Sequence, residues 1–166
     1  MSNDAAQDVT AQEPLGIRTG PDRVSAITTA KFLGYAGLLP FVFLALASLM
    51  GLHLPFAPSQ ALLIGYGAVI LTFVGALHWG AQLASGAPSS WPFIWSVIPS
   101  LMGWVALMVP AGFAALIIII GLITCWAIDR RAIAKGIWPS WMGSMRTILT
   151  AIACLSMMVI YLPLLG

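Results

Sequence analysis

The sequence predicts an all-α membrane protein, a bundle of about five helices that each cross the bilayer. Of its 166 residues, 60% are hydrophobic and only 7% are charged, whereas a soluble domain carries roughly 25% charged residues. No Asp, Glu, Lys or Arg lies between Lys31 and Asp129. Because about 20 apolar residues cross the hydrocarbon core as a helix, this stretch has room for four spans. A further apolar run follows Arg146.

The chain divides into a tail and one membrane domain. Residues 1–28 mix acidic and basic side chains with small polar ones and show no hydrophobic periodicity. Such a composition is typical of disorder, so we expect a disordered cytoplasmic tail. Residues 29–166 then form the five-helix transmembrane domain.

Five apolar stretches are separated by Gly- and Pro-rich breaks, which favour turns, and by one polar segment. The predicted spans cover about residues 30–50, 59–84, 91–108, 113–128 and 141–162. Pro99 lies inside the third span and predicts a kink there. The polar segment 129–140 fits a short interfacial helix as well as a plain basic loop.

The orientation follows from the basic residues. Apart from Arg146, they precede the first span or separate the last two: Arg18, Arg23, Lys31, Arg130, Arg131 and Lys135. Four crossings separate the two groups, so both lie on one side of the membrane. The positive-inside rule assigns that side to the cytoplasm, with the N-terminus inside and the C-terminus outside.

The tryptophans are one-sided under this topology. Only Trp104 falls toward the outside, and the other six fall in the inner half: Trp79, Trp91, Trp95, Trp126, Trp138 and Trp141. Tryptophan prefers the headgroup level of a bilayer. The set therefore indicates either an inner aromatic anchor or an aromatic-lined pocket that opens at the inner leaflet.

Small side chains recur every four residues along the second span and predict a helix-packing stripe. The stripe consists of Ala68, Thr72, Ala76, Gly80 and Ala84. Small residues let helix backbones approach closely in lipid, where van der Waals packing drives association.

Polar side chains inside the spans predict an inner polar layer. Intramembrane ionisable residues are rare and suggest function by default. The candidate ligand-binding or polar-layer residues are His78, Trp79, Gln82, Asp129, Trp141 and Arg146. Each has a simpler interpretation: His78 could fix packing through an interhelical hydrogen bond, and Arg146 could extend its head to the interface. Asp129 could be an interface residue, or could pair with Arg146 or Arg130. The alternative is that His78 and Arg146 hold the polar head of a membrane-soluble molecule, such as a quinone or an anionic lipid.

Several classes of function are disfavoured. The net charge of +2 is too small to indicate nucleic-acid binding. No residues have metal-ligand spacing, and no nucleophile, P-loop or dinucleotide motif is present. We therefore expect no catalytic residues, metal or cofactor, and the sequence favours a non-catalytic protein over an enzyme.

The residues also resemble a known family, domain of unknown function 3429, which includes the eukaryotic transmembrane protein 69. The resemblance covers about residues 31–160. It is carried by these positions: Tyr66 through Gly80 with Gly75-Ala76-Leu77-His78-Trp79-Gly80, Val97-Ile98-Pro99-Ser100-Leu101, Gly103-Trp104, Asp129, Pro139-Ser140-Trp141, Arg146 and Leu149-Thr150. It implies a multi-pass protein of the bacterial inner (plasma) membrane, with mitochondrial relatives and no known activity. It also marks His78, Trp79, Pro99, Asp129, Trp141 and Arg146 as characteristic of the family.

Two functions remain open. The first is a non-catalytic accessory or assembly subunit of a larger membrane complex, which fits the small size and the packing stripe. The second is the binding or transfer of a lipid-like small molecule, a quinone or an anionic lipid, at an inner-leaflet pocket. Besides the lipid bilayer, the expected partner is another membrane protein or a second copy of the chain.

Overall fold

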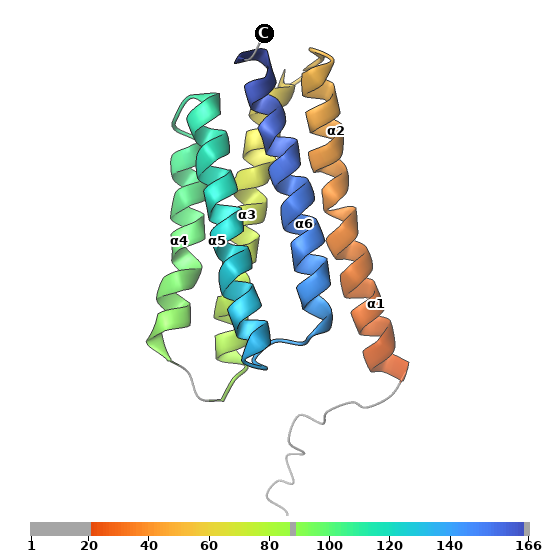
Figure 1. Ribbon diagram of the computed structural model, residues 1–166, viewed down its shortest axis with the longest axis vertical. Coiled ribbons are helices and arrows are strands. Elements are labelled where there is room, and N and C mark those ends of the chain that lie inside the picture. The colour runs from red at the N-terminus through yellow and green to blue at the C-terminus, as the bar shows by residue number, and fades with distance from the viewer. Residues whose placement is uncertain (1–20, 87–88, 165–166) are drawn as a thin grey trace, which may run out of the picture.

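The computed structural model describes residues 21–86 and 89–164 as an all-α helix bundle, which confirms the predicted fold class (Figure 1). A two-stranded antiparallel hairpin, β1 (His53–Leu54) with β2 (Ala57–Pro58), fills the turn between the second and third helices. The helices are α1 (Pro21–Ala36), α2 (Leu38–Leu49), α3 (Ser59–Leu83), α4 (Ser90–Ala106), α5 (Ala111–Ala134) and α6 (Trp141–Met158), followed by the 3-10 helix η1 (Val159–Leu164).

Four helical segments of the described chain are long and apolar enough to cross a membrane. They are Val24–Leu49, which joins α1 to α2, then Ser59–Leu83, Ala111–Ala134 and Trp141–Leu162. The remaining helix, α4, has 17 residues and is about 25 Å long at 1.5 Å per residue. Large apolar side chains such as Phe73, Leu101 and Leu155 are exposed on the outside of the bundle, as expected of a surface that faces lipid.

Two predicted boundaries differ from the structure. Helix α1 begins at Pro21, inside the stretch expected to be a tail, whereas residues 1–20 lie outside the described part of the chain. Proline suits the first helical position because its missing N–H would have no partner there. Helix α5 continues through residues 129–134, so this part of the polar segment is neither a separate interfacial helix nor a loop. No helix breaker occurs before Gly136, whose φ of +71° ends the helix in the left-handed region.

The helices form a closed ring in which α2, α3, α4, α5 and α6 each contact the next, and α6 returns to α2. Helix α3 also contacts α5 across the ring. The start of α1, the α3–α4 connection and the α5–α6 connection lie at one end of the bundle (Figure 1). We call this end, which carries Arg131 and Lys135 at the close of α5, the basic end.

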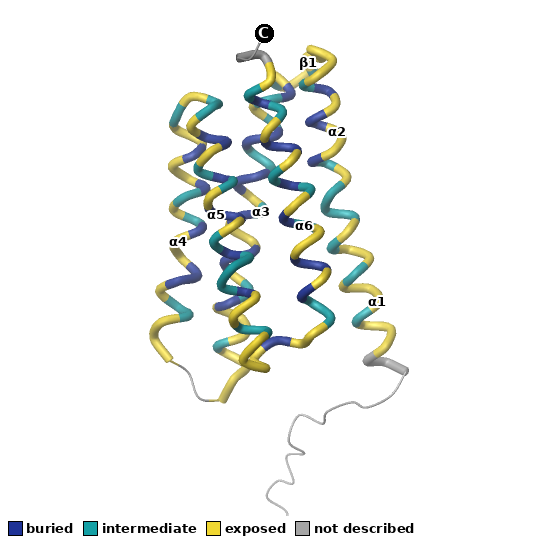
Figure 2. Tube along the Cα trace, in the orientation of Figure 1, coloured by how far each residue is buried: buried dark blue, intermediate teal, exposed yellow. Residues whose placement is uncertain are grey.

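The close contacts between α3 and α4 involve Ala68 and Thr72 of the predicted stripe and, beside the stripe, Gly75. Only Ala68 of that stripe is buried, with its carbonyl 3.0 Å from the position that a Cβ on Gly103 would take. The other four members, Thr72, Ala76, Gly80 and Ala84, are exposed. On the neighbouring face of α3, a Cβ on Gly75 would lie 2.8 Å from Pro99 of α4. Figure 2 shows these alternating buried and exposed faces.

Candidate functional site

Three charged or polar side chains from three helices meet inside the basic half of the bundle. His78 of α3 donates from Nε2 to Oδ1 of Asp129 on α5, at 2.9 Å. Arg146 of α6 donates from Nε to Oδ2 of the same carboxylate, at 2.6 Å. Asp129 is fully buried, and His78 and Arg146 are only 8% and 5% exposed. We call these residues the Asp129 triad.

The triad decides which partners Arg146 and Asp129 have, a question that the sequence left open. Arg146 is buried and paired with Asp129, so it does not extend its head to the interface. Asp129 pairs with Arg146, and not with the exposed Arg130. His78, Asp129 and Arg146 thus form one buried polar cluster. Asp129, the carboxylate partner of His78, lies 51 positions away from it in the chain.

The hydrogen bonds also orient the His78 ring. An ionised carboxylate can only accept hydrogen bonds, so Nε2 of His78 carries the hydrogen that faces Asp129. Nδ1 then has no hydrogen-bond partner among the residues that the structure describes. The ring stacks against Trp138, with centroids 4.6 Å apart and planes inclined by 29°. His78 is therefore held on both sides, with one ring nitrogen available to a ligand.

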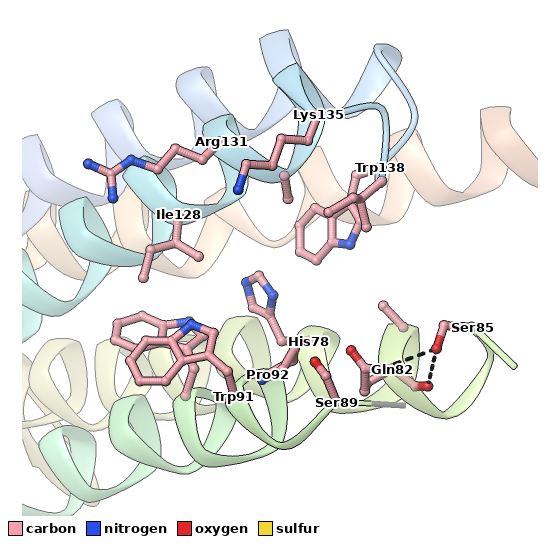
Figure 3. Close-up of a pocket in the computed structure, with 14 residues that line it drawn as sticks. His78, Gln82, Ser85, Ser89, Trp91, Pro92, Ile128, Arg131, Lys135 and Trp138 are labelled. Carbon is pink, nitrogen blue, oxygen red and sulfur yellow. Dashed lines mark hydrogen bonds between the residues drawn. The ribbon is translucent and has the colours of Figure 1, made fainter. Parts of the chain in front are cut away.

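A cavity of about 410 Å³ adjoins His78 at the basic end (Figure 3). In Figure 3, α3 and α4 form one wall, and α5 with the following loop forms the other. We call it the cationic cavity. Its lining consists of His78, Ala81, Gln82, Ser85, Ser89, Trp91, Pro92, Trp95, Ile128, Arg131, Ala132, Lys135, Ile137 and Trp138.

The lining of the cationic cavity combines positive charge with aromatic surface. Arg131 and Lys135 are its charged residues, and no Asp or Glu belongs to the lining. Trp91, Trp95 and Trp138 supply large aromatic faces. The indole N–H of Trp95 is buried and has no acceptor among the described residues. The cavity therefore combines cations with apolar, aromatic walls.

Arg146 lines a different cavity. This second space of about 120 Å³ lies between α1, α2, α3, α5 and α6, on the other side of the Asp129 triad. Consequently His78 and Arg146 are joined through Asp129, yet they do not line a common cavity. The hypothesis that both hold one polar head is therefore incorrect in its geometry.

The other three predicted site residues, Gln82, Trp79 and Trp141, lie outside the Asp129 triad. Gln82 lines the cationic cavity and donates to Ser85 Oγ at 3.1 Å. Trp79 is 44% exposed and packs edge-on against Phe93. Trp141 lies under the ammonium group of Lys31, 5.7 Å from the ring centroid. Neither Trp79 nor Trp141 lines the cationic cavity.

Sequence reasoning missed the role of Arg131 and Lys135 as cavity residues. The signal was present in the spacing, because Ile128, Arg131, Ala132 and Lys135 recur at i, i+3, i+4 and i+7, which places them on one helix face. That face went unnoticed because the predicted span ended at residue 128. Once α5 is continued through Ala134, the same face points into the cavity.

Comparison with known proteins shows a family match and two similar curated proteins. The family described as protein of unknown function, DUF3429, matches residues 26–162. Transmembrane protein 69 from Xenopus tropicalis is 34% identical over 134 residues, and the match covers 77% of this chain and 51% of that protein. Transmembrane protein 69 from Mus musculus is 29% identical over 136 residues, covering 78% and 54%.

The chain spans about half the length of these curated relatives. No solved structure matches it. The family match extends over nearly all of the membrane helices and includes every member of the Asp129 triad. This multi-pass membrane protein therefore belongs to the DUF3429 family.

Proposed function

We propose that the protein binds an anionic amphiphile, a lipid with an anionic headgroup, in the cationic cavity. The observation that carries the proposal is the pairing of Arg131 and Lys135 in a lining without any acidic residue. Two cations that face one cavity without a counterion favour an anion. Guanidinium and ammonium groups are the usual partners of phosphate oxygens.

The size and walls of the cavity support an amphiphile over a small inorganic ion. A volume of about 410 Å³ lies within the range of small-molecule sites, roughly 300–1,000 Å³. Trp91 and Trp138 offer apolar faces to the acyl part of a lipid. The cavity also lies at the end of the bundle, where a headgroup would reside.

The positive-inside rule supports placing this end at the cytoplasmic leaflet of a bacterial inner membrane. Arg131 and Lys135 lie at the close of α5 and Lys31 lies in α1, which starts at the same end (Figure 1). The ligand would then come from the inner leaflet, which agrees with an aromatic-lined pocket there.

The test is a titration of phosphatidylglycerol, with phosphatidylcholine of the same acyl chains as comparison, into the protein in mild detergent. Native mass spectrometry reads the bound lipid. We expect preferential binding of phosphatidylglycerol. Loss of each cation should weaken it by about 1 kcal/mol, so the double variant Arg131→Gln/Lys135→Gln should bind about thirtyfold more weakly.

The matched control is Arg130→Gln, which removes the same charge from an exposed neighbour outside the cavity. It should bind phosphatidylglycerol like the wild type. If Arg130→Gln and Arg131→Gln weaken binding equally, general attraction to anionic lipid explains the affinity, and the cavity does not.

A second candidate function is that of an accessory or assembly subunit. The observation in its favour is the row Ala76, Gly80 and Ala84 on α3, which is exposed although small residues suit close helix contacts. Another membrane helix could pack there. The variant Gly80→Leu should then lose a stoichiometric partner during purification in mild detergent. A wild-type protein that purifies without any partner at native expression would argue against this role.

A further inference from the structure

Besides its two cations, the cationic cavity is lined by a histidine with one unpaired ring nitrogen. Nε2 of His78 is bound to Oδ1 of Asp129 at 2.9 Å, and no described residue bonds to Nδ1. Nδ1 is nevertheless not among the fully buried polar atoms without a partner, which are Nε1 of Trp95 and Nη2 of Arg146. It therefore keeps accessible surface. Since His78 lines the cationic cavity and not the second one, we assign that surface to the cationic cavity.

The surroundings of His78 hold its ring in this orientation. One face stacks against Trp138, with centroids 4.6 Å apart. The carboxylate of Asp129 that receives Nε2 is itself fixed by Nε of Arg146 at 2.6 Å. A half-turn of the ring would place a carbon against that carboxylate and lose the hydrogen bond. In Figure 3 the ring projects from α3 into the space between the two walls.

The charge balance of the Asp129 triad makes Nδ1 a hydrogen-bond acceptor. The single negative charge of Asp129 is already compensated by Arg146. A proton on Nδ1 would add a positive charge to a buried cluster, beside a cavity that Arg131 and Lys135 already make positive. Such a charge is unfavourable there. We therefore take His78 as neutral, with its hydrogen on Nε2 and a lone pair on Nδ1.

An acceptor nitrogen beside two cations defines the chemistry of the ligand. Arg131 and Lys135 favour an anion, whereas Nδ1 of His78 requires a hydrogen-bond donor. An ammonium group would supply donors, but it would bring a third positive charge to a lining without Asp or Glu. A hydroxyl group donates without any charge. The suitable ligand therefore carries a phosphate and a hydroxyl together.

The spacing along α5 suits a phosphate and a hydroxyl in one headgroup. Arg131 and Lys135 follow Asp129 by two and six residues toward the basic end, which is about 3 and 9 Å at the helical rise. The cations thus lie nearer that end, and His78 lies deeper. A phosphate bound by the cations would leave the alcohol of its headgroup directed inward, toward Nδ1.

We propose that the cationic cavity selects anionic lipids whose headgroup carries a free hydroxyl, and that this hydroxyl donates a hydrogen bond to Nδ1 of His78. The inference rests on the proposed function, because it names the headgroup that the same cavity accepts. Glycerol and inositol headgroups belong to this class. Serine and ethanolamine headgroups carry an ammonium group, and phosphatidic acid has no headgroup alcohol.

The experiment compares two lipids with the same charge and acyl chains. They are phosphatidylglycerol and phosphatidylpropanol, whose three-carbon headgroup has no hydroxyl. Native mass spectrometry of the full chain in mild detergent reads the binding of each. The wild type should bind phosphatidylglycerol about fivefold more tightly, as expected for one neutral hydrogen bond.

Two variants assign this preference to a residue. His78→Phe keeps an aromatic ring against Trp138 and removes the acceptor, so it should bind both lipids equally. Arg131→Gln removes a contact to the phosphate that both lipids share. It should weaken both by the same factor and keep the fivefold preference.

A second measurement leaves His78 in place, in case His78→Phe does not fold. The chain has two histidines, so His53→Gln protein labelled with 15N-histidine gives imidazole signals from His78 alone. A lone-pair nitrogen shifts upfield when it accepts a hydrogen bond. In phosphatidylcholine nanodiscs, the Nδ1 signal should shift when phosphatidylglycerol is added and stay in place with phosphatidylpropanol.

The outcomes separate this inference from the proposed function. Equal binding of both lipids by the wild type would overturn the inference alone, whereas binding of neither would overturn both. A preference that persists in His78→Phe, or an Nδ1 signal that phosphatidylglycerol leaves unchanged, would show that another group recognises the hydroxyl. The soluble headgroup glycerophosphoglycerol is the last probe. If it binds as tightly as phosphatidylglycerol, the ligand is not a lipid and the proposal is overturned.

Discussion

The two halves of the bundle are built on different principles. In the half away from the basic end, no charged side chain among the described residues is buried, and the interior is mainly apolar, with Leu63, Ile118 and Met157 at 0% exposure. In the basic half, the interior contains the Asp129 triad and the cationic cavity, and the second cavity lies near the middle of the bundle. The same helices run through both halves (Figure 1), so the difference arises from side chains alone.

This contrast separates stability from binding. Apolar packing around glycines is sufficient to hold helices together in lipid. A buried ion pair is a poor source of stability, because the cost of desolvating the charges offsets their attraction. We therefore infer that the main role of the Asp129 triad is to position His78 and Arg146 beside their two cavities, and that it adds little stability.

The largest expected loss of unfolding free energy comes from removing the carboxylate of the triad. Asp129→Leu leaves Arg146 buried without its carboxylate and removes the acceptor of His78. Removing one partner of a buried pair costs about 3–5 kcal/mol. Unfolding by SDS in mixed micelles should show a loss of this size. A loss below about 1 kcal/mol would mean that the pair behaves as if it were at the surface.

A smaller effect is expected in the packing between α3 and α4. Gly75→Ala places a Cβ 2.8 Å from Pro99 and 2.9 Å from the Ser96 carbonyl oxygen, which should cost about 1–3 kcal/mol of unfolding free energy. Gly80→Ala is the control on the same helix, because its Cβ would meet nothing within 4 Å. It should be neutral or stabilise by up to about 1 kcal/mol. Equal losses in both variants would contradict the packing described between these helices.

The smallest change in stability is expected when the whole triad is replaced. His78→Phe/Asp129→Leu/Arg146→Met removes all charge from the layer and keeps its volume similar. Such replacements are often neutral or stabilising, so the unfolding free energy should stay within about 1 kcal/mol of the wild type or rise. A triple variant as unstable as Asp129→Leu would show that the triad does stabilise the fold.

The sequence allowed the bundle to be predicted because hydrocarbon imposes strict rules on composition. Long uncharged runs, with breaks at glycine and proline, are sufficient to indicate spanning helices. His78, Asp129 and Arg146 stood out for the same reason, because ionisable residues are rare within membrane spans. Their depth could be inferred from helical rise alone, and the structure joins them through one carboxylate.

The cavities could not be predicted in this way, because they depend on how helices lie beside one another. Spacing showed that the small stripe shares one face of α3, but not that α4 would pack against Ala68, Thr72 and Gly75. Depth showed that His78 and Arg146 share a layer, but not that Asp129 would separate their cavities. Such lateral relations require tertiary contacts.

The most direct test of ligand binding at the basic end is a crystal structure grown from a lipidic mesophase doped with phosphatidylglycerol. We expect lipid phosphate density within hydrogen-bond distance of Arg131 and Lys135. A cationic cavity closed by its own side chains, or lipid bound only around Arg130 on the outer surface, would contradict the proposed function.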